Sequence, residues 1–137
     1  MSGTFGVGSV LLFHNYVFDD GTSKAKFLVL LGKQDNGNCL LVLTTSQRHY
    51  KVDKPGCTQH PRTYYLIEGD RKNFFNKDTW LLLYDPKILT TAELINLGMK
   101  REIDIKHQII QNKIGHIRNC FKNSDDVSKL HLEICGF

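Results

Sequence analysis

Three apolar runs of strand length in the first third of the chain constrain its fold most. They are Ser9–His14 (SVLLFH), Lys26–Leu31 (KFLVLL) and Cys39–Thr45 (CLLVLTT). The turn sequences Asp19-Asp20-Gly21 and Asp35-Asn36-Gly37-Asn38 separate them, and glycine tolerates the positive φ of a tight turn. The second and third runs are apolar at consecutive positions, which is typical of strands buried on both faces. The pattern predicts antiparallel strands in the core of a barrel or sandwich.

The middle of the chain is first polar and then apolar again. Residues 46–63 contain two prolines and no periodic apolar pattern, so they predict a long loop. Thr63–Ile67 (TYYLI) and Thr79–Tyr84 (TWLLLY) are rich in aromatic and aliphatic residues. They are predicted to be the fourth and fifth strands.

A helical pattern begins near residue 90. Thr90 and Glu93 have the spacing of a capping box, which predicts a short helix that Gly98 ends. A short strand through Ile88–Leu89 is equally compatible with this stretch.

The clearest helical pattern lies over Ile105–Phe121. Apolar residues recur there at spacings of three and four, which places them on one face of a helix. Gly115 lowers the helix propensity by about 1 kcal/mol relative to alanine and is compatible with close packing. Further on, Leu130–Ile134 (LHLEI) alternates, which predicts a last strand in a tail of residues 129–135.

Together these elements indicate a fold class. The 137 residues suit one domain, and the apolar fraction of 41% and charged fraction of 23% are near globular averages. Strands over residues 8–90 followed by a late helix favour a mainly β fold with a C-terminal helix (α+β). Because the strands do not alternate with helices, a small antiparallel β-barrel is predicted instead of a doubly wound sheet.

The sequence contains no complete motif for a metal or a cofactor, and none is expected. Cys39, Cys57, Cys120 and Cys135 include no CxxC pair, so reduced thiols are expected, although two disulfides are formally possible. Cys57, His60 and His49 are residue types that bind zinc, but the sequence supplies no fourth ligand at the spacing of a zinc site. Residues 1–8 do not resemble a secretory leader, and the longest apolar runs are far too short to cross a bilayer. A cytoplasmic protein without membrane contact is therefore expected.

A dense polar cluster, Thr44-Thr45-Ser46-Gln47-Arg48-His49, follows the third run. Hydroxyl groups, a guanidinium and an imidazole at the end of a strand are suited to holding a phosphodiester. The net charge of +4 permits an anionic partner such as nucleic acid. The alternative is that this segment is an ordinary polar exit from a strand.

The order of these segments resembles the PemK/MazF toxin family. The resemblance rests first on a glycine-led strand (8–12), a turn (19–24), a strand (26–31) and an apolar strand ending in Thr-Ser-Gln (39–47). It continues more loosely through the strand at 78–83 and the helix at 105–121. It implies an SH3-like barrel, usually a homodimer, that cuts single-stranded RNA without metal and is inhibited by a cognate antitoxin.

The resemblance also implies a catalytic set. In the family the ribose 2′-hydroxyl attacks the adjacent phosphate and leaves a 2′,3′-cyclic phosphate. The family threonine or serine corresponds to Thr45, with Ser46 beside it. The family arginine corresponds to Lys26, and the proline after it to Phe27. Six other residues are candidates for RNA contacts or for the remaining acid, base or clamp: Lys24, His14, Arg48, His49, Arg62 and Arg71.

Two alternatives remain beside the endoribonuclease. The lysine in place of arginine favours a non-catalytic barrel that binds RNA or a protein partner. A β-barrel of unrelated function is the other. Phe74, Phe75 and Trp80 are candidates for a dimer or antitoxin surface, and core packing explains them equally well.

Overall fold

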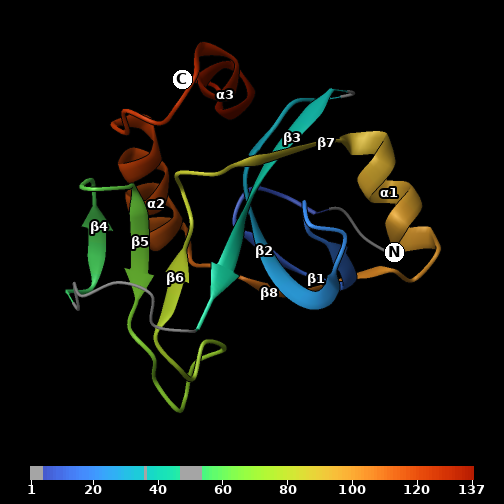
Figure 1. Ribbon diagram of the computed structural model, residues 1–137, viewed down its shortest axis with the longest axis horizontal. Helices are drawn as coiled ribbons and strands as arrows, with labels where there is room; N and C mark the ends of the chain where they lie inside the picture. The colour runs from blue at the N-terminus through green and yellow to red at the C-terminus, as the bar shows by residue number, and fades with distance from the viewer. Residues whose placement is uncertain (1–4, 36, 47–53) are drawn as a thin grey trace.

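The computed structural model describes residues 5–35, 37–46 and 54–137. In this part of the chain, eight strands and three helices form around one antiparallel sheet (Figure 1). The strands are β1 (Ser9–Val17), β2 (Ser23–Lys33), β3 (Asn38–Thr45), β4 (Gly56–Thr58), β5 (Tyr64–Ile67), β6 (Thr79–Leu81), β7 (Lys87–Thr90) and β8 (Ile103–Gln108). The helices are α1 (Thr91–Met99), α2 (Gln111–Lys122) and α3 (Lys129–Cys135). The fold is therefore mainly β, as predicted.

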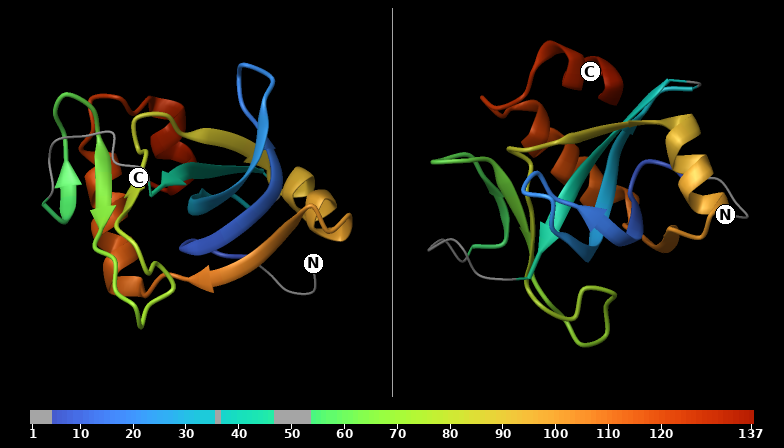
Figure 2. Two further views of the ribbon diagram at one scale, coloured as in Figure 1. Left: turned by 60° about the horizontal axis from the view of Figure 1, so that its bottom comes forward. Right: turned by 45° about the vertical axis from the view of Figure 1, so that its right-hand side comes forward.

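The sheet is not closed into a barrel. Its strands follow the order β4-β5-β6-β3-β2-β1-β8, and β7 pairs with β3 beside this path. Strand β3 pairs with β2 on one side, and on its other side first with β7 and then with β6. Helix α2 follows β8 and packs against β4 and β5 (Figure 2). The two ends of the sheet are thus bridged by a helix and not by a strand ladder, which corrects the predicted closed barrel.

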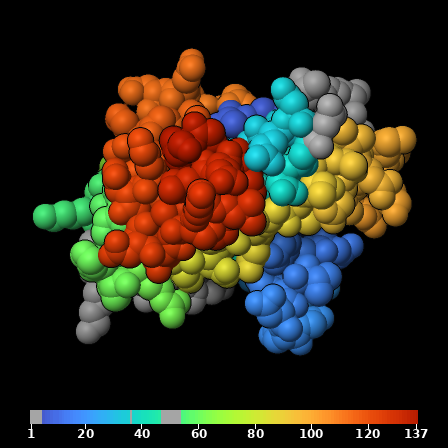
Figure 3. All heavy atoms as spheres, turned by 90° about the horizontal axis from the view of Figure 1, so that it is seen from above, coloured from blue at the N-terminus to red at the C-terminus, as the bar shows by residue number. Residues whose placement is uncertain are grey.

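Strands β2 and β3 are buried on both faces, as their uninterrupted apolar sequences predicted. Val29 and Leu31 of β2 face a core shared with α2 and α3. Leu28 and Leu30 face a second core that includes Leu94 of α1. The helices therefore cover opposite faces of the central strands. Figure 3 shows α2 and α3 in orange and red over one side, with the β1–β2 hairpin (blue) projecting away from the body.

The predicted helix over Ile105–Phe121 is wrong in its first part. Residues 103–108 form β8, which pairs antiparallel with β1 and places His107 opposite Val10. The helix begins only at Gln111. Of the predicted apolar stripe, Ile114, Ile117 and Phe121 are buried in the core, whereas Ile110, just before the helix, is 66% exposed. Residues 103–108 are a strand because they pair with β1, which is distant in sequence, and local periodicity takes no account of such pairing. An added Cβ at Gly115 would meet nothing within 4 Å, so this glycine serves no close packing.

The predicted last strand is also wrong, because residues 129–135 form helix α3. Ser128 caps this helix by accepting a hydrogen bond from the His131 backbone N–H at 3.2 Å. Gly136 ends it in the left-handed conformation that favours glycine. The five alternating residues were too short a pattern to distinguish a strand from a helix.

The region around residue 90 contains both predicted elements. Strand β7 leads directly into α1, and Thr90 and Glu93 form the predicted capping box with hydrogen bonds of 3.0 and 2.9 Å. Gly98 lies within the last turn, and α1 continues to Met99. The predicted fifth strand is shorter than expected, ending at Leu81, and the predicted loop contains the short strand β4.

Cys57 and Cys120 form a disulfide, contrary to the expected reduced thiols. Strand β4 and helix α2 bring their Cα atoms to 5.6 Å, within the range that a disulfide spans. Their sequence separation of 63 residues gave no signal of this pairing. Cys39 and Cys135 are free thiols buried in the core. Among the described residues, no helix is both long and apolar enough to cross a membrane.

Candidate functional site

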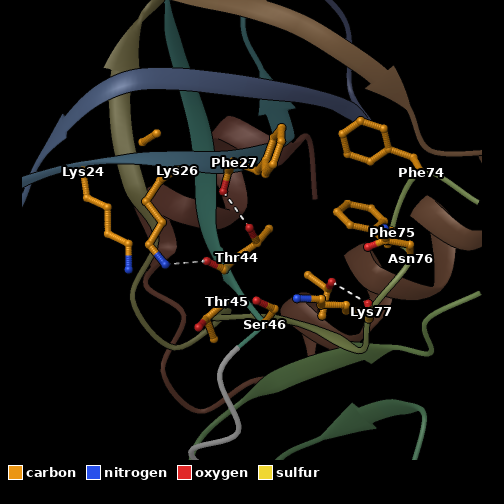
Figure 4. A pocket seen from close by; sticks show the side chains of 12 residues that line it. Lys24, Lys26, Phe27, Thr44, Thr45, Ser46, Phe74, Phe75, Asn76 and Lys77 are labelled. Carbon is orange, nitrogen blue, oxygen red and sulfur yellow. Dashed lines mark hydrogen bonds between the residues drawn. The ribbon is translucent and has the colours of Figure 1, made fainter.

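A cavity of about 510 Å³ opens where the start of β2 meets the end of β3 (Figure 4). The start of β2 and the end of β3 form two of its walls. The third wall is the segment of residues 68–78 between β5 and β6, here called the Phe loop. The lining residues are Lys24, Ala25, Lys26, Phe27, Thr44, Thr45, Ser46, Phe74, Phe75, Asn76, Lys77 and Thr79.

The antiparallel pairing of β2 with β3 builds the polar side of this cavity. The register Leu28–Leu43 brings residues 24–27 beside residues 44–46. The Thr44 hydroxyl donates a hydrogen bond of 2.8 Å to the Phe27 carbonyl, and the Lys26 Nζ donates one of 3.3 Å to the Thr44 carbonyl. Thr44 and Thr45 are buried and Ser46 is exposed. The strand ends therefore hold an ammonium group next to hydroxyl groups.

The cavity is electrostatically positive. Lys24, Lys26 and Lys77 contribute ammonium groups, and no acidic residue is among its described lining residues. Burial lowers the pKa of Lys26, and the charge of Lys24 lowers it further. An anion bound here would relieve the repulsion between these cations, so the cavity favours a phosphate group.

The Phe loop is held at its base by backbone contacts. The Gly69 N–H donates to the Asp78 carboxylate at 2.8 Å, and the Asp70 N–H donates to the Phe75 carbonyl at 3.1 Å. A Cβ added to Gly69 would lie 2.4 Å from the Lys77 carbonyl carbon, so only glycine allows this closure. The loop thereby presents two adjacent phenylalanines to the cavity in a defined position.

Three phenylalanine rings form the apolar side of the cavity, and a histidine ring packs against one of them. Phe74 meets Phe27 and Phe75 edge to face, with ring centroids 5.3 and 5.1 Å apart. His107 of β8 stacks on Phe74 at 4.8 Å with an angle of 4° between the rings. The sequence had suggested Phe74 and Phe75 only for a dimer surface or the core, and had given His107 no role. The sequence signal for this aromatic surface is the pair of adjacent phenylalanines within a polar, charged segment.

The structure brings together four of the predicted site residues. Lys24, Lys26, Thr45 and Ser46 all line the cavity, although they come from two strands. Trp80 does not line the cavity and is buried with Tyr64 and Leu66, so core packing explains it.

Other predicted site residues lie elsewhere. His14 of β1 is 2.6 Å from the Asp104 carboxylate of β8, and this hydrogen bond lowers the pKa of Asp104. Arg62 lies over the Tyr84 ring at 4.8 Å. Arg71 is exposed in the Phe loop and does not line the cavity. Arg48 and His49 lie outside the described residues.

Fold and site together define a bent antiparallel-sheet protein with a basic cavity that has an aromatic wall. Within the described ranges, no three His, Cys, Asp or Glu side chains are grouped so that they could hold a metal ion. No protein-family model, curated protein or solved structure matches this chain. The relation to the PemK/MazF toxins therefore remains a proposal.

Proposed function

We propose that the chain is an endoribonuclease of the PemK/MazF kind, which cleaves single-stranded RNA without metal at the cavity between β2 and β3. The observation that carries the proposal is the meeting of Lys26 with Thr45 and Ser46, the residues that the resemblance implies. The aromatic wall adds support, since aromatic rings and cations together suit the bases and phosphates of a single strand.

The proposed reaction is a transesterification within the RNA. The 2′-hydroxyl loses its proton to the neutral Lys26 amine, and the 2′-oxygen attacks the adjacent phosphorus. The bond from phosphorus to the 5′-oxygen breaks, and the Lys26 ammonium returns the proton to that oxygen. The products are a 2′,3′-cyclic phosphate and a 5′-hydroxyl. The Thr45 and Ser46 hydroxyls donate to the phosphorane oxygens, and Lys24 and Lys77 balance its charge.

Several further features belong to the same proposal. The fold is proposed to be an opened form of the SH3-like barrel. The support for this is that β3 pairs with strands of both halves of the sheet. The resemblance also implies a homodimer, a cognate antitoxin and a cytoplasmic location.

A metal-free cleavage assay tests the proposed function. Long single-stranded RNA incubated with the protein in EDTA should yield fragments with 2′,3′-cyclic phosphate and 5′-hydroxyl ends. The double variant Lys26→Ala/Thr45→Ala should lose this activity by about 100-fold or more. Lys129→Ala, an exposed change on α3, is the matched control and should cleave normally. Undiminished cleavage by the double variant would reject the assigned site.

A non-catalytic RNA-binding protein is the second candidate. It is favoured by the absence of histidine and carboxylate groups among the described lining residues, since binding needs only cations and rings. It predicts RNA binding with no cleavage at any excess of protein. Cyclic phosphate ends formed in EDTA would exclude it.

A further inference from the structure

A second cavity, of about 290 Å³, shares Phe74 and Phe75 with the first. It lies between the Phe loop, strand β8 and the start of α2. Its lining residues are Ile67, Glu68, Lys72, Asn73, Phe74, Phe75, His107, Ile109, Ile110 and Lys113. The volume of about 290 Å³ lies just below the roughly 300–1,000 Å³ typical of ligand sites, so the cavity suits at most one nucleoside.

The second cavity combines apolar surface with positive charge. Ile110 stands at 66% exposure although it is a large apolar residue. Phe75 and His107 meet edge to face beside it, with ring centroids 6.3 Å apart. Lys72 of the Phe loop and Lys113 of α2 add two ammonium groups. An apolar floor with two cations fits a flat base that carries phosphates on either side.

The two cavities lie on either side of a shared aromatic wall, since Phe74 and Phe75 line both. Phe74 contacts Phe27 of the first cavity and stacks on His107 of the second. A strand whose phosphate lies among Lys24, Lys26 and Lys77 would therefore reach the second cavity with a neighbouring nucleotide. The hydrogen bonds at the base of the Phe loop hold this wall in place before any ligand binds.

We propose that the second cavity is a subsite for the nucleotide next to the phosphate held in the first cavity. Its base packs against Phe75, His107 and Ile110. Its outer phosphate binds Lys72 and Lys113. The Glu68 carboxylate and the Asn73 amide line the same cavity and supply hydrogen-bonding groups for the edge of the base. This inference rests on the proposed function only in taking single-stranded RNA as the ligand, because it requires binding and not cleavage.

Binding of a non-cleavable RNA tests the subsite. Fluorescein-labelled 2′-fluoro oligonucleotides of two and six nucleotides lack the attacking hydroxyl, and fluorescence anisotropy reports their affinity. Lys72→Ala/Lys113→Ala should weaken hexanucleotide binding about tenfold or more and leave dinucleotide binding unchanged. The slope of log affinity against log salt should become shallower by about 0.7, since the outer phosphate is one contact and each phosphate contact accounts for about 0.7. Lys100→Ala/Lys129→Ala removes the same charge from exposed positions elsewhere and is the control.

A base-stacking probe tests the apolar part of the subsite. 2-Aminopurine placed at successive positions of the hexanucleotide should be quenched at one position, and Ile110→Ser or Phe75→Leu should remove that quenching. Ile95→Ser alters a similarly exposed isoleucine on α1, at 47% exposure, and should leave it intact. Because Ile110 is exposed, its replacement keeps the core and remains informative if Phe75→Leu fails to fold.

The outcomes separate the subsite from the proposed cleavage. Loss of hexanucleotide affinity and of quenching in the variants supports the subsite even if the wild type cleaves no RNA in EDTA. Normal affinity and quenching in both sets of variants would overturn the subsite, even if Lys26-dependent cleavage occurs. A wild-type protein that binds no oligonucleotide would overturn both proposals.

Discussion

Lys26 is the residue on which the proposed chemistry depends. Its ammonium group is half-buried, lies near a second cation and donates a hydrogen bond to the Thr44 carbonyl. These surroundings disfavour the charged form and lower the pKa of Lys26. An arginine at this position would stay protonated, so lysine changes how a proton can be exchanged there.

Cleavage should therefore depend on pH through Lys26. Below the lowered pKa of Lys26 the neutral amine increases tenfold for each pH unit, so the rate should rise with pH and level off above that pKa. Lys26→Arg keeps the charge but holds its proton, so its cleavage rate should lose the rise with pH that the wild type shows. Cleavage rates measured with one RNA in a series of buffers of increasing pH check this.

Lys24→Arg is the matched control for this experiment. It makes the same substitution two residues away and should retain the wild-type pH profile. If Lys26→Arg cleaves at the wild-type rate, Lys26 acts only as a positive charge and the proton-transfer role is wrong.

At the scale of the elements, the attachment of α3 to the sheet depends on one glycine. Gly32 lies at a register irregularity between β2 and β3. A Cβ at this position would lie 2.7 Å from the Cys135 Sγ and 2.8 Å from the Cys135 Cα. The close approach of helix to strand is thus possible only without a side chain.

Two glycine substitutions should have opposite effects on stability. Gly32→Ala should lower the free energy of unfolding by about 1–3 kcal/mol, because the added methyl group overfills the contact with α3. Gly115→Ala should raise it by about 0.5–1 kcal/mol, because alanine is the better helix former and its Cβ meets nothing within 4 Å. Urea unfolding followed by circular dichroism measures both. Equal changes in the two variants would contradict the role given to Gly32.

At the scale of the whole molecule, the Cys57–Cys120 disulfide joins one end of the sheet to α2. Closing a loop of this length restricts the unfolded chain and stabilises a protein by about 4 kcal/mol in the chain-entropy account. Such bonds persist in oxidising compartments and are rare in a reducing cytosol. The disulfide therefore counts against the proposed cytoplasmic location.

Thiol counting and reduction test the disulfide. The native protein should show no rapidly reacting thiol toward Ellman's reagent, because Cys39 and Cys135 are buried and burial raises the pKa of Cys135 to about 11. Two thiols should react after unfolding, and all four after unfolding with a reductant. Reduction should lower the urea midpoint of the wild type and leave that of Cys57→Ser/Cys120→Ser unchanged. Four reactive thiols without reductant would show that the bond is absent.

The sequence by itself determined those features of the protein that depend on local interactions. Uninterrupted apolar runs predicted that β2 and β3 are buried on both faces, and the Thr90–Glu93 spacing predicted the cap of α1. The order of motifs led to Lys24, Lys26, Thr45 and Ser46, which the cavity brings together. The first two of these signals lie within a few residues, where backbone conformation, capping and alternation act, whereas the order of motifs extends along much of the chain.

The tertiary structure alone decided the remaining features. Residues 103–108 are a strand because β1 offers an edge to pair with, and residues 129–135 are a helix that packs on β2 and β3. The Cys57–Cys120 bond and the stacking of His107 on Phe74 join positions far apart in the chain. Such contacts depend on the free energy of pairing and burial between distant segments, which no local pattern contains. For this reason the sequence led to the polar side of the cavity, whereas its aromatic wall emerged only from the fold.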